Sequence, residues 1–388
     1  MNDVQSASRG TQREPASGAL PKPNIADITS AVRQHPDFAG HERVLAVSEP
    51  ASGLDALIAI HDTTLGPALG GCRLATYESS EAALADALRL SRAMTYKAAV
   101  AGVALGGGKA VMRKTPAFRA TEALFRAFGR ALEALDGRYI TGEDAGSTVR
   151  EMDWIGAETR HVIGTTRLGG TPSSATATGV LAGMKAAVAH RLGYERMAGV
   201  TVAVQGLGGV GMVLCELLAA EGARLVVADI DPARCDEARR RIEARVVAPA
   251  EIHRIPADVF APCALGGVLD DASVPALRCA VVAGAANNQL RHSGIAGELR
   301  RRGILYAPDY VINAGGLIAA FMSLSGYRPG DDAVLARVRG IASILTAMAR
   351  RADAEGRTPA AVADLIAEER IAAGRAAPGA AQKRRTGT

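Results

Sequence analysis

The most informative segment of the chain reads Val200-Thr201-Val202-Ala203-Val204-Gln205-Gly206-Leu207-Gly208-Gly209-Val210-Gly211. Its apolar start predicts a buried strand, and a Gly-x-Gly-x-x-Gly turn leads directly into a sequence with helical spacing of Val and Leu. The next strand, at 224–228, is closed by Asp229, 18 positions after Gly211. The glycines permit the turn and the approach of a pyrophosphate, whose charge a helix N-terminus favours. This order of elements predicts a Rossmann dinucleotide-binding domain.

The side chains at 229 and 234 bear on which dinucleotide binds. The Asp229 carboxylate is suited to ribose hydroxyls and would repel a 2′-phosphate, which favours NAD over NADP. Arg234 stands close by in the sequence and could accept that phosphate. We therefore expect NAD, and the sequence alone leaves NADP open.

Three more short strands are expected at 259–261, 280–283 and 304–306, and each ends in a small or polar motif. The carboxyl ends of parallel strands face the ligand crevice of such a sheet, although the asparagines here could equally tie loops together. We expect the following residues to contact the cofactor: Gly206, Gly208, Gly209, Val210, Gly211, Asp229, Cys263, Ala264, Ala285, Asn287 and Asn313.

A second glycine-rich stretch, Leu105-Gly106-Gly107-Gly108-Lys109, lies in the first half of the chain. Three consecutive glycines suggest a backbone that comes close to another group. A helix predicted at 82–95 would deliver Lys97 just past its end, and a strand is predicted at 110–112, so both lysines could project into one cleft. An isolated segment of this kind is more often a flexible surface loop with a solvated lysine, and that alternative stays open.

Asp144 is the third candidate of this half. It follows a strand predicted at 138–141, and Thr148 and Glu151 then have the spacing of a capping box for the next helix. An aspartate in this position is often only a turn or helix cap. The pattern by itself therefore does not separate catalysis from capping.

The length of 388 residues, of which 48% are hydrophobic, is enough for two α/β domains with separate cores. The ends of the chain are expected to lack structure, apart from a short helix near 25–32. The predicted organisation is a disordered extension at 1–40, a substrate-binding and catalytic domain at 41–172 with helices at 331–372 packed back on it, the Rossmann domain at 173–330, and a disordered basic tail at 373–388.

Charge and composition argue against several classes of function. The formal charge is +5, but residues 370–388 hold five basic and no acidic side chains, so a nucleic-acid partner for the nearly neutral body is not expected. The five cysteines and seven histidines show neither CxxC nor HExxH spacing, so we expect no disulfide framework and no metal site. The chain lacks the long apolar run of a membrane helix and the apolar segment of a signal peptide, which predicts a soluble, cytoplasmic protein.

A set of short motifs is spread over both halves of the chain. In order they are Gly66-Pro67-Ala68-Leu69-Gly70-Gly71, Met94-Thr95-Tyr96-Lys97, Gly106-Gly107-Gly108-Lys109, Gly206 to Gly211, Ala261-Pro262-Cys263-Ala264-Leu265-Gly266-Gly267, Gly284 to Asn288, Tyr306-Ala307-Pro308-Asp309-Tyr310 and Asn313-Ala314-Gly315-Gly316. With them, the chain from about Glu42 to Arg370 resembles the glutamate/leucine/phenylalanine/valine dehydrogenase family, and its apolar-substrate branch most closely. The resemblance implies reversible, NAD-dependent oxidative deamination of an L-amino acid to a 2-oxo acid and ammonia, in a homo-oligomer.

The same resemblance implies roles for individual residues. Lys97 would bind the substrate carboxylate, Lys109 would be the catalytic lysine, and Asp144 would be its partner in proton transfer. These roles are chemically reasonable, because a fixed cation suits a carboxylate and a second lysine in a dry cleft is driven towards its neutral, basic form. Gly70 would offer a backbone contact, and Asn288 would hold the substrate against the nicotinamide.

Position 69 bears on the substrate. Glutamate-specific relatives carry a lysine there, whereas Leu69 would leave a buried acidic side chain without a partner, so a bulky apolar amino acid is expected. Gly142 and Leu317 resemble the phenylalanine-preferring pattern, and Gly142 would leave room for an aromatic ring. Ala320 is expected beside them, in a segment from 317 to 323 that is more apolar than in relatives.

Two alternatives accompany this interpretation. The first is a non-catalytic NAD-binding sensor or scaffold on the same fold, which would need neither a base nor a proton relay, so that the joint presence of Lys97, Lys109 and Asp144 weighs against it. The second is a dehydrogenase of the family with another substrate, such as tryptophan.

Overall fold

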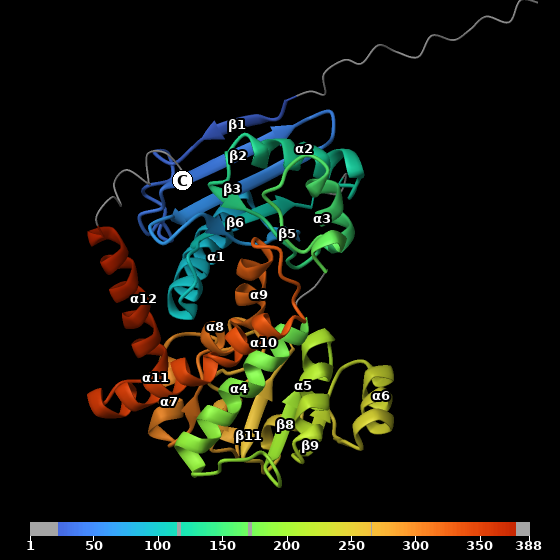
Figure 1. Ribbon diagram of the computed structural model, residues 1–388, viewed down its shortest axis with the longest axis vertical. Coiled ribbons are helices and arrows are strands. Elements are labelled where there is room, and N and C mark those ends of the chain that lie inside the picture. The colour runs from blue at the N-terminus through green and yellow to red at the C-terminus, as the bar shows by residue number, and fades with distance from the viewer. Residues whose placement is uncertain (1–21, 115–117, 170–172, 265, 378–388) are drawn as a thin grey trace, which may run out of the picture.

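The computed structural model describes residues 22–114, 118–169, 173–264 and 266–377, which form two α/β domains (Figure 1). The first domain contains a mixed sheet of seven strands, and the second contains a parallel sheet of six. The fold class expected from the sequence is confirmed.

The first domain is built from seven strands and three helices. Their bounds are β1 Asn24–Asp27, β2 Arg43–Glu49, β3 Leu54–Asp62, β4 Ala68–Leu69, β5 Cys72–Ala75, α1 Ser80–Ala101, β6 Gly106–Arg113, α2 Glu122–Glu133, β7 Tyr139–Ile140 and α3 Val149–Gly156. The sheet order is β1-β2-β3-β6-β4-β7, and β5 pairs with β6 in parallel. Apolar residues alternate along the strands, so α1 covers one face of the sheet and α2 with α3 covers the other.

The three glycines before Lys109 lie inside strand β6, so the alternative of a flexible surface loop, which the sequence left open, is wrong. A Cβ atom at Gly107 would overlap the backbone nitrogen of Thr95 in α1. A Cβ at Gly108 would come within 2.7 Å of the Tyr139 ring. Because β6 has no side chains here, the backbone of α1 can pack directly on the strand.

Helix α1 is longer than predicted, and Lys97 lies within it rather than past its end. Ser79 caps the N-terminus by accepting a hydrogen bond from the Ala82 amide at 3.0 Å. No helix breaker occurs until Gly102, which ends the helix in the left-handed conformation with φ +66°. Lys97 is therefore carried by a regular helix.

Both predicted disordered ends contain ordered structure among the described residues. Residues 24–27 form β1 and not the expected helix, because their backbone pairs with β2 from Asn24–Ser48 to Asp27–Leu45 and Ile25 packs on the sheet core. Residues 373–376 belong to a C-terminal helix, in which Arg375 donates to Asp62 at 2.6 Å. Residues 1–21 and 378–388 lie outside the described residues.

The second domain has the strand order of a dinucleotide-binding sheet, β10-β9-β8-β11-β12-β13, with all neighbours parallel. The strands are β8 Thr201–Gln205, β9 Arg224–Ala228, β10 Arg245–Val246, β11 Val259–Pro262, β12 Val281–Val282 and β13 Leu305–Tyr306. The helices are α4 Ser173–Leu192, α5 Gly209–Ala220, α6 Pro232–Ile242, α7 Gly294–Arg301, α8 Asp309–Ile312, α9 Gly315–Ser323, α10 Asp332–Arg339, α11 Ile341–Glu355 and α12 Pro359–Ala376. Short 3₁₀ turns occur at Thr166–Leu168, Ile252–Arg254 and Val274–Ala276.

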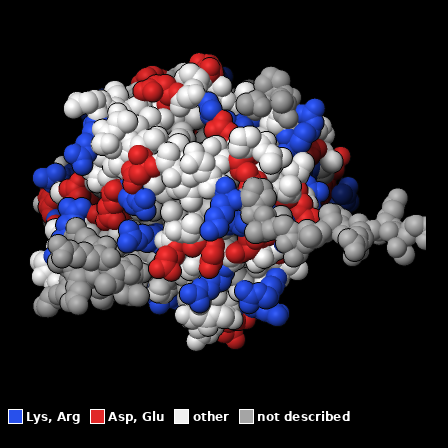
Figure 2. Space-filling model, turned by 90° about the horizontal axis from the view of Figure 1, so that it is seen from above, with Lys and Arg blue, Asp and Glu red and all other residues white. Residues whose placement is uncertain are grey.

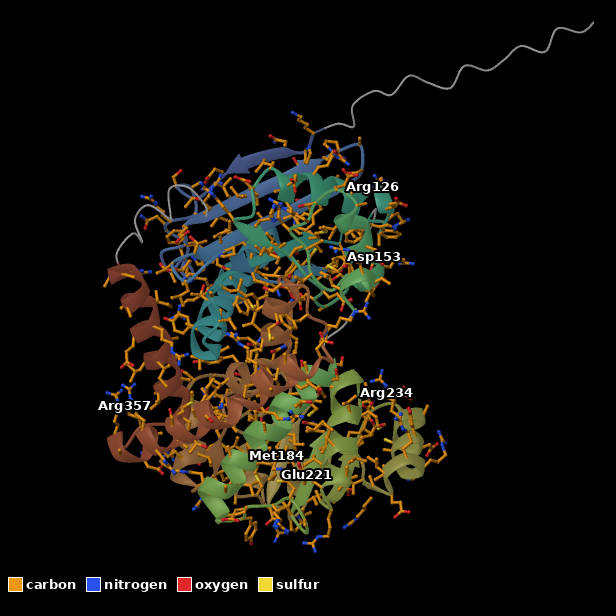
Figure 3. The ribbon with its side chains drawn as sticks, in the orientation of Figure 1. Arg126, Asp153, Met184, Glu221, Arg234 and Arg357 are labelled. Atoms are coloured by element: carbon orange, nitrogen blue, oxygen red, sulfur yellow. The ribbon has the colours of Figure 1, made fainter. Side chains whose placement is uncertain are left out.

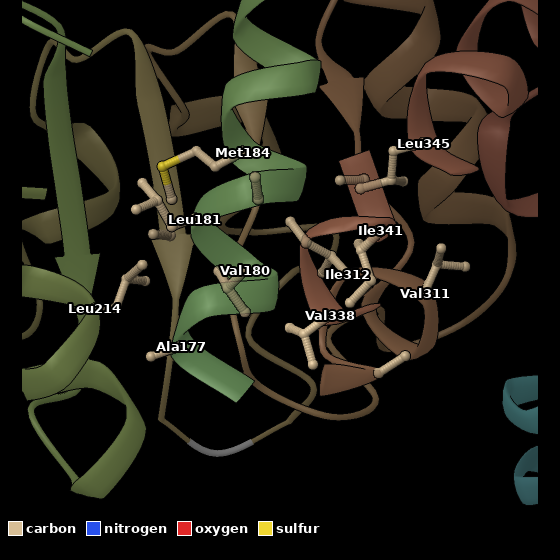
Figure 4. Packing of buried hydrophobic residues seen from close by; sticks show 14 of the residues in the cluster. Ala177, Val180, Leu181, Met184, Leu214, Val311, Ile312, Val338, Ile341 and Leu345 are labelled. Carbon is tan, nitrogen blue, oxygen red and sulfur yellow. The ribbon is translucent and has the colours of Figure 1, made fainter. Parts of the chain in front are cut away.

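Helix α4 is the centre of the larger core (Figure 4). It packs against α5 on one side and against α8, α10 and α11 on the other. Gly183 makes this possible, because a Cβ there would meet Leu345 at 2.5 Å and Ile312 at 2.7 Å. Helices α10 and α11 are thus held by the second domain, unlike the prediction that all C-terminal helices return to the first.

Helix α12 is the exception and reaches the first domain (Figure 1). Arg370 donates from one guanidinium nitrogen to the carbonyls of Ala99 at 2.6 Å and Val100 at 2.7 Å. These carbonyls belong to the last turn of α1, where Ala99 also accepts from the Gly102 amide at 3.1 Å and where the helix dipole attracts a cation. Helix α12 therefore adds to the Gly102 cap at the end of the helix that carries Lys97.

Charges of both signs are mixed on the molecular surface. Figure 2 shows Lys and Arg interspersed with Asp and Glu over the face that it presents. Within the described ranges, no helix combines the length and the apolarity needed to cross a membrane.

His61 should make the stability of the protein depend on pH. Its ring is buried, with Nδ1 2.9 Å from Thr95 Oγ1 and Nε2 3.2 Å from the Ala39 carbonyl, and burial together with His41 lowers its pKa to about 4. In the unfolded chain it would take up a proton near pH 6.5, so stability present above pH 6.5 is lost as the pH falls towards 4. We expect protonation of this histidine to lower the free energy of unfolding by about 3 kcal/mol.

Urea unfolding at a series of pH values measures that loss, and His61→Gln is the matched variant. Its unfolding free energy should change less between pH 6.5 and 4 than that of the unmodified protein, because the substituted side chain does not titrate. An equal pH dependence in both proteins would contradict the assignment.

Candidate active site

A cavity of about 480 Å³ lies where the two domains meet. Its wall is formed by α1, β5, β6 and the β7–α3 segment of the first domain, and by α8, α9 and the loop after β12 in the second. The structure brings Lys97, Lys109 and Asp144 together in this cavity. The cleft anticipated for the two lysines is therefore present.

Lys109 and Asp144 form an ion pair in which the lysine is buried and the carboxylate is half-buried. Lys109 stands on β6 with its side chain 7% exposed, and its Nζ contacts Oδ2 of Asp144. Burial, assisted by the charge of Arg73, lowers the pKa of Lys109 although Asp144 opposes this. Burial acts to raise the pKa of Asp144, but Lys109 and Arg73 outweigh it and the net pKa is lowered. A lysine with a weakened hold on its proton beside a fixed carboxylate can exchange protons with a bound reactant.

Lys97 is a cation held in a defined place. From α1 it donates through Nζ to Oδ1 of Asn313 at 2.6 Å. Burial lowers the pKa of Lys97 to about 8, and Asp309 partly offsets this effect. Burial raises the pKa of Asp309, whose two oxygens accept from the Gln289 amide at 3.0 Å and the Tyr310 amide at 2.7 Å.

Asn313 links Lys97 to residues expected at the cofactor. Its Nδ2 donates to Oδ1 of Asn287 at 2.7 Å and to the Ala285 carbonyl at 3.1 Å. Asn288 follows with φ +51°, a conformation that asparagine tolerates better than most side chains, and it lines the same cavity. The sequence assigned Asn313 to the cofactor alone, whereas its contacts span both halves of the cavity.

The apolar wall of the cavity includes Leu69, Leu317 and Ala320, as expected. The space above Gly142 is filled, contrary to the expectation of room for an aromatic ring: a Cβ there would lie 2.8 Å from Cγ1 of Ile163. Ile163 comes from the segment after α3 and lines the cavity itself. The side chain at 163 therefore controls the space that the glycine leaves.

Gly70, for which a backbone contact with substrate is expected, is hydrogen-bonded within the sheet and is not among the residues that line the cavity. Its amide donates to the Ile140 carbonyl at 3.2 Å, and its carbonyl accepts from the Tyr139 hydroxyl at 2.6 Å. A Cβ would overlap the Gly108 carbonyl. The neighbouring Gly71 lines the cavity instead.

The glycine turn after β8 fits a dinucleotide pyrophosphate. Gly206 has φ +101°, and a Cβ at Gly211 would overlap the Gly206 carbonyl, so both glycines are needed for the turn. Gly208 and Gly209 face open space at the N-terminus of α5: Cβ atoms there would meet only Arg234 at 3.8 Å and Ser173 at 3.4 Å. Such an open cradle of backbone at a helix N-terminus suits a phosphate group.

Two of the other expected cofactor residues, Cys263 and Ala264, lie against this turn. A Cβ on Gly206 would come within 2.8 Å of Ala264, and one on Gly211 within 3.3 Å of Cys263, so both residues pack on the turn. Val210 and Ala285 line the cavity.

Asp229 has a structural role in addition to any contact with a ribose. Its Oδ2 accepts from the Leu207 amide at 2.6 Å, and its Oδ1 accepts from the Asp231 amide at 2.8 Å. Arg234 lies at the outer edge of the second domain (Figure 3), with a guanidinium nitrogen 3.9 Å from Oδ2 of Asp229. Asp229 therefore orders the glycine turn as well as presenting a carboxylate.

Comparison with known proteins identifies the family. Residues 41–161 match the dimerisation domain of the Glu/Leu/Phe/Val dehydrogenases, and residues 231–379 match the description Glutamate/Leucine/Phenylalanine/Valine dehydrogenase. The chain belongs to the glutamate/leucine/phenylalanine/valine dehydrogenase family. The predictions of this family and of an enzyme are confirmed: the protein is an amino acid dehydrogenase with a dinucleotide-binding domain.

Several relatives match this dehydrogenase over most of its length. L-tryptophan dehydrogenase of Nostoc punctiforme is 46% identical over 86% of this chain and 94% of its own length. Leucine dehydrogenase of Bacillus cereus is 46% identical over 86% and 91%, and valine dehydrogenase of Streptomyces albus is 45% identical over 91% and 100%. The crystal structure of the Nostoc enzyme has a TM-score of 0.78 at 43% identity, over 90% of this chain and 99% of that chain. Relatives of nearly equal similarity thus carry the names of three different substrates.

Sequence reasoning missed three residues of this dehydrogenase site. Arg73 contacts Asp144 and stands in β5 directly after the Gly70-Gly71 motif, and this place next to the motif was the available signal. Asp309 stands in a motif at the carboxyl end of β13, where ligand-facing residues are expected. Ile163 gave no signal, because it reaches the cavity from a loop with no periodic pattern.

Proposed function

We propose that the enzyme catalyses reversible, NAD-dependent oxidative deamination of a bulky apolar L-amino acid to the 2-oxo acid and ammonia. One observation carries this proposal: Lys97 and the Lys109–Asp144 pair face the same cavity, whose remaining wall is largely apolar. A fixed cation, a poised base and an apolar pocket are what an α-amino acid with an apolar side chain requires.

The chain supplies binding and proton transfer. Lys97 would hold the substrate carboxylate, and Asn288 would keep the substrate in the orientation for reaction. Neutral Lys109 would take a proton from the water that adds to the imino carbon, and Asp144 would move a proton at the departing nitrogen. A bound dinucleotide would supply, through its nicotinamide, the acceptor for the hydride. Closure between the two domains would exclude water.

The buried Lys109–Asp144 pair also weighs against a non-catalytic sensor. Taking both charges out of water costs free energy, and a module that only binds a dinucleotide gains nothing from it. Catalysis gives the pair a purpose, because a base with a lowered pKa is useful near neutral pH.

NAD is proposed over NADP because the Asp229 carboxylate, which accepts hydrogen bonds from two backbone amides, would repel a 2′-phosphate. Assembly as a homo-oligomer is proposed because the matched first domain is a dimerisation domain. We also propose 41–172 and 173–330 as the two functional units, with α12 tied to the first.

The experiment is a turnover assay, followed by the absorbance of the reduced cofactor, with NAD⁺ and NADP⁺ separately. The substrates are L-Trp, L-Phe, L-Leu, L-Val and L-Glu. Turnover with an apolar amino acid and NAD⁺ is expected. If protein shown to be folded and to bind the dinucleotide turned over none of the five amino acids, the proposed activity would be contradicted. Turnover with L-Glu alone would contradict the inference from Leu69.

Ile163→Ala should shift the substrate preference towards larger side chains. Truncation opens the space above Gly142, and pocket differences of this size are worth about 1 to 3 kcal/mol. We expect the ratio of kcat/KM for L-Trp to that for L-Leu to rise by about tenfold or more. Ile344→Ala, the same truncation in α11, is the control and should leave the ratio unchanged.

The affinity for carboxylates should fall as the pH rises through about 8, where Lys97 loses its charge in the free enzyme. Well above that pH we expect the affinity to fall about tenfold for each further pH unit. Calorimetric measurement of the dissociation constant of the 2-oxo acid product at a series of pH values would show this loss of affinity. Lys97→Arg should remove this pH dependence, since a guanidinium stays charged. A flat profile in the unmodified enzyme would rule out Lys97 as the carboxylate cation.

A further inference from the structure

Asp144 is held by two cations and not by Lys109 alone. Nε of Arg73 lies 3.2 Å from Oδ2 of Asp144, the same oxygen that contacts Lys109. Arg73 comes from β5, Lys109 from the neighbouring β6, and Asp144 from the segment between β7 and α3. The carboxylate is thus fixed from two strands at once.

Arg73 is itself fixed at its other end. Its Nη1 donates to Oδ2 of Asp86 in α1 at 3.0 Å, and the Tyr77 hydroxyl donates to the same oxygen at 2.6 Å. Tyr77, Asp86, Arg73, Asp144 and Lys109 therefore form one continuous chain of polar contacts, and its charged members alternate in sign. The side chains of Arg73 and Asp86 are 24% and 19% exposed, so solvent screens these contacts only partly.

The two cations on Asp144 differ in chemistry. Lysine can lose its proton, and the proposed reaction requires Lys109 to do so. A guanidinium keeps its charge at any working pH. When Lys109 is neutral, Arg73 is therefore the cation that remains on a carboxylate enclosed by protein, which would otherwise be driven to take up a proton.

We propose that Arg73 is a positioning residue of the reaction: it fixes the Asp144 carboxylate against Lys109 and keeps it ionised in both protonation states of the lysine, while Asp86 and Tyr77 fix Arg73. This inference rests on the proposed function for its kinetic part. Its electrostatic part stands on the geometry alone, because it concerns the charge around Lys109 in the free protein.

The charges around Lys109 determine how removal of Arg73 changes the pKa of the lysine. Burial lowers the pKa of Lys109 and Arg73 lowers it further, so loss of the guanidinium should raise it. The titratable or charged groups near Lys109 come from three places: Asp144 and Glu143 from the segment after β7, Arg73 and Cys72 from β5, and Lys97 from α1. Substitution at 73 leaves the others in place, so the shift of the lysine can be assigned to Arg73.

The first test measures pH profiles of kcat/KM for Arg73→Gln and Arg73→Lys. For Arg73→Gln we expect kcat to fall by about 10²-fold with little change in KM, and the acidic limb of the profile to move up by about one pH unit. Arg73→Lys keeps the charge but lacks the planar fork that bridges two carboxylates. The acidic limb of the Arg73→Lys profile should stay at the same pH, while the kcat of this variant falls.

Arg113→Gln is the matched control. Arg113 lies on β6 and pairs with Asp55 and Ser80, away from the cavity-lining residues. This variant also removes an arginine from an ion pair of the same sheet, and it should leave kcat and the acidic limb unchanged. Tyr77→Phe removes one hydrogen bond and no charge, so kcat should fall a few-fold with the limb in place.

A second measurement does not depend on turnover. Acetic anhydride reacts only with neutral amines, so the pH dependence of acetylation at Lys109, quantified by mass spectrometry, gives the midpoint of its titration. We expect the midpoint to rise by about one unit in Arg73→Gln and to stay in place in Arg113→Gln. An enzyme without turnover would refute the proposed function, yet this midpoint would still test Arg73.

Three results would overturn the proposal. One is an unchanged Lys109 midpoint in folded Arg73→Gln. Another is an Arg73→Lys enzyme with the kcat of the unmodified protein, which remains decisive even where Arg73→Gln does not fold. Reduced kcat in Arg73→Gln with an unmoved acidic limb would also count against it, because a merely structural arginine predicts that pattern.

Discussion

Replacing Lys109 by alanine is expected to lower kcat by about 10³-fold or more while dinucleotide binding is retained. The amine is the proposed base, and alanine offers no substitute for it. The fold should survive, because Asp144 keeps Arg73 as a partner at 3.2 Å and is not left as an unpaired buried charge. Steady-state turnover gives kcat, and quenching of protein fluorescence by the reduced cofactor gives binding.

Two further variants sharpen this result. Lys109→Arg should not restore activity, since a guanidinium cannot give up its proton. Lys185→Ala removes a lysine of α4 that is bonded to Glu221 at 2.7 Å, and it should leave kcat unchanged. Substantial turnover in Lys109→Ala would refute the assignment of the base.

Gly107→Ala is expected to lower the free energy of unfolding by about 3 kcal/mol or more. The added Cβ would overlap the backbone nitrogen and the hydroxyl of Thr95, and neither atom belongs to a flexible side-chain end. Helix α1 would have to move away from β6, so the distance between Lys97 and Lys109 would grow. Urea unfolding measures the first effect, and kcat measures the second.

Gly297→Ala is the control for this substitution. Gly297 lies inside α7, and a Cβ there meets nothing within 4 Å. Alanine is a better helix former, so this variant should gain about 0.5 to 1 kcal/mol of stability. Equal effects of the two glycine substitutions would contradict the direct packing of α1 on β6 as their cause.

Local patterns predicted the second domain well. The strand, glycine turn and helix around 200–220 depend on contacts between neighbours in sequence, and the sheet has the order that this motif implies. The capping box of Thr148 and Glu151 is likewise present at α3. Such features are readable because the residues that form them are few positions apart.

Features set by distant contacts were predicted less well. The glycines before Lys109 looked like a loop, because the reason for them, the backbone of α1, lies outside their own segment. Strand β1 gains its structure from pairing with β2 and not from its own composition. Ile163 fills the space above Gly142 from a separate loop, so a comparison of single positions could not find it. The three principal candidates, Lys97, Lys109 and Asp144, do share one cavity.

The cap that Arg370 places on α1 joins residues 271 and 270 positions apart in the chain. At a synthesis rate of about 5 to 20 residues per second, the first domain must exist for roughly 15 to 50 s before its partner leaves the ribosome. During that time the last turn of α1 lacks the hydrogen bonds from Arg370, and the wall of the cavity supplied by α9 has not been made. A chain stalled before α9 would thus carry Lys97 and Lys109 without an enclosed site, because part of the cavity wall is supplied by residues of the second domain up to Pro329.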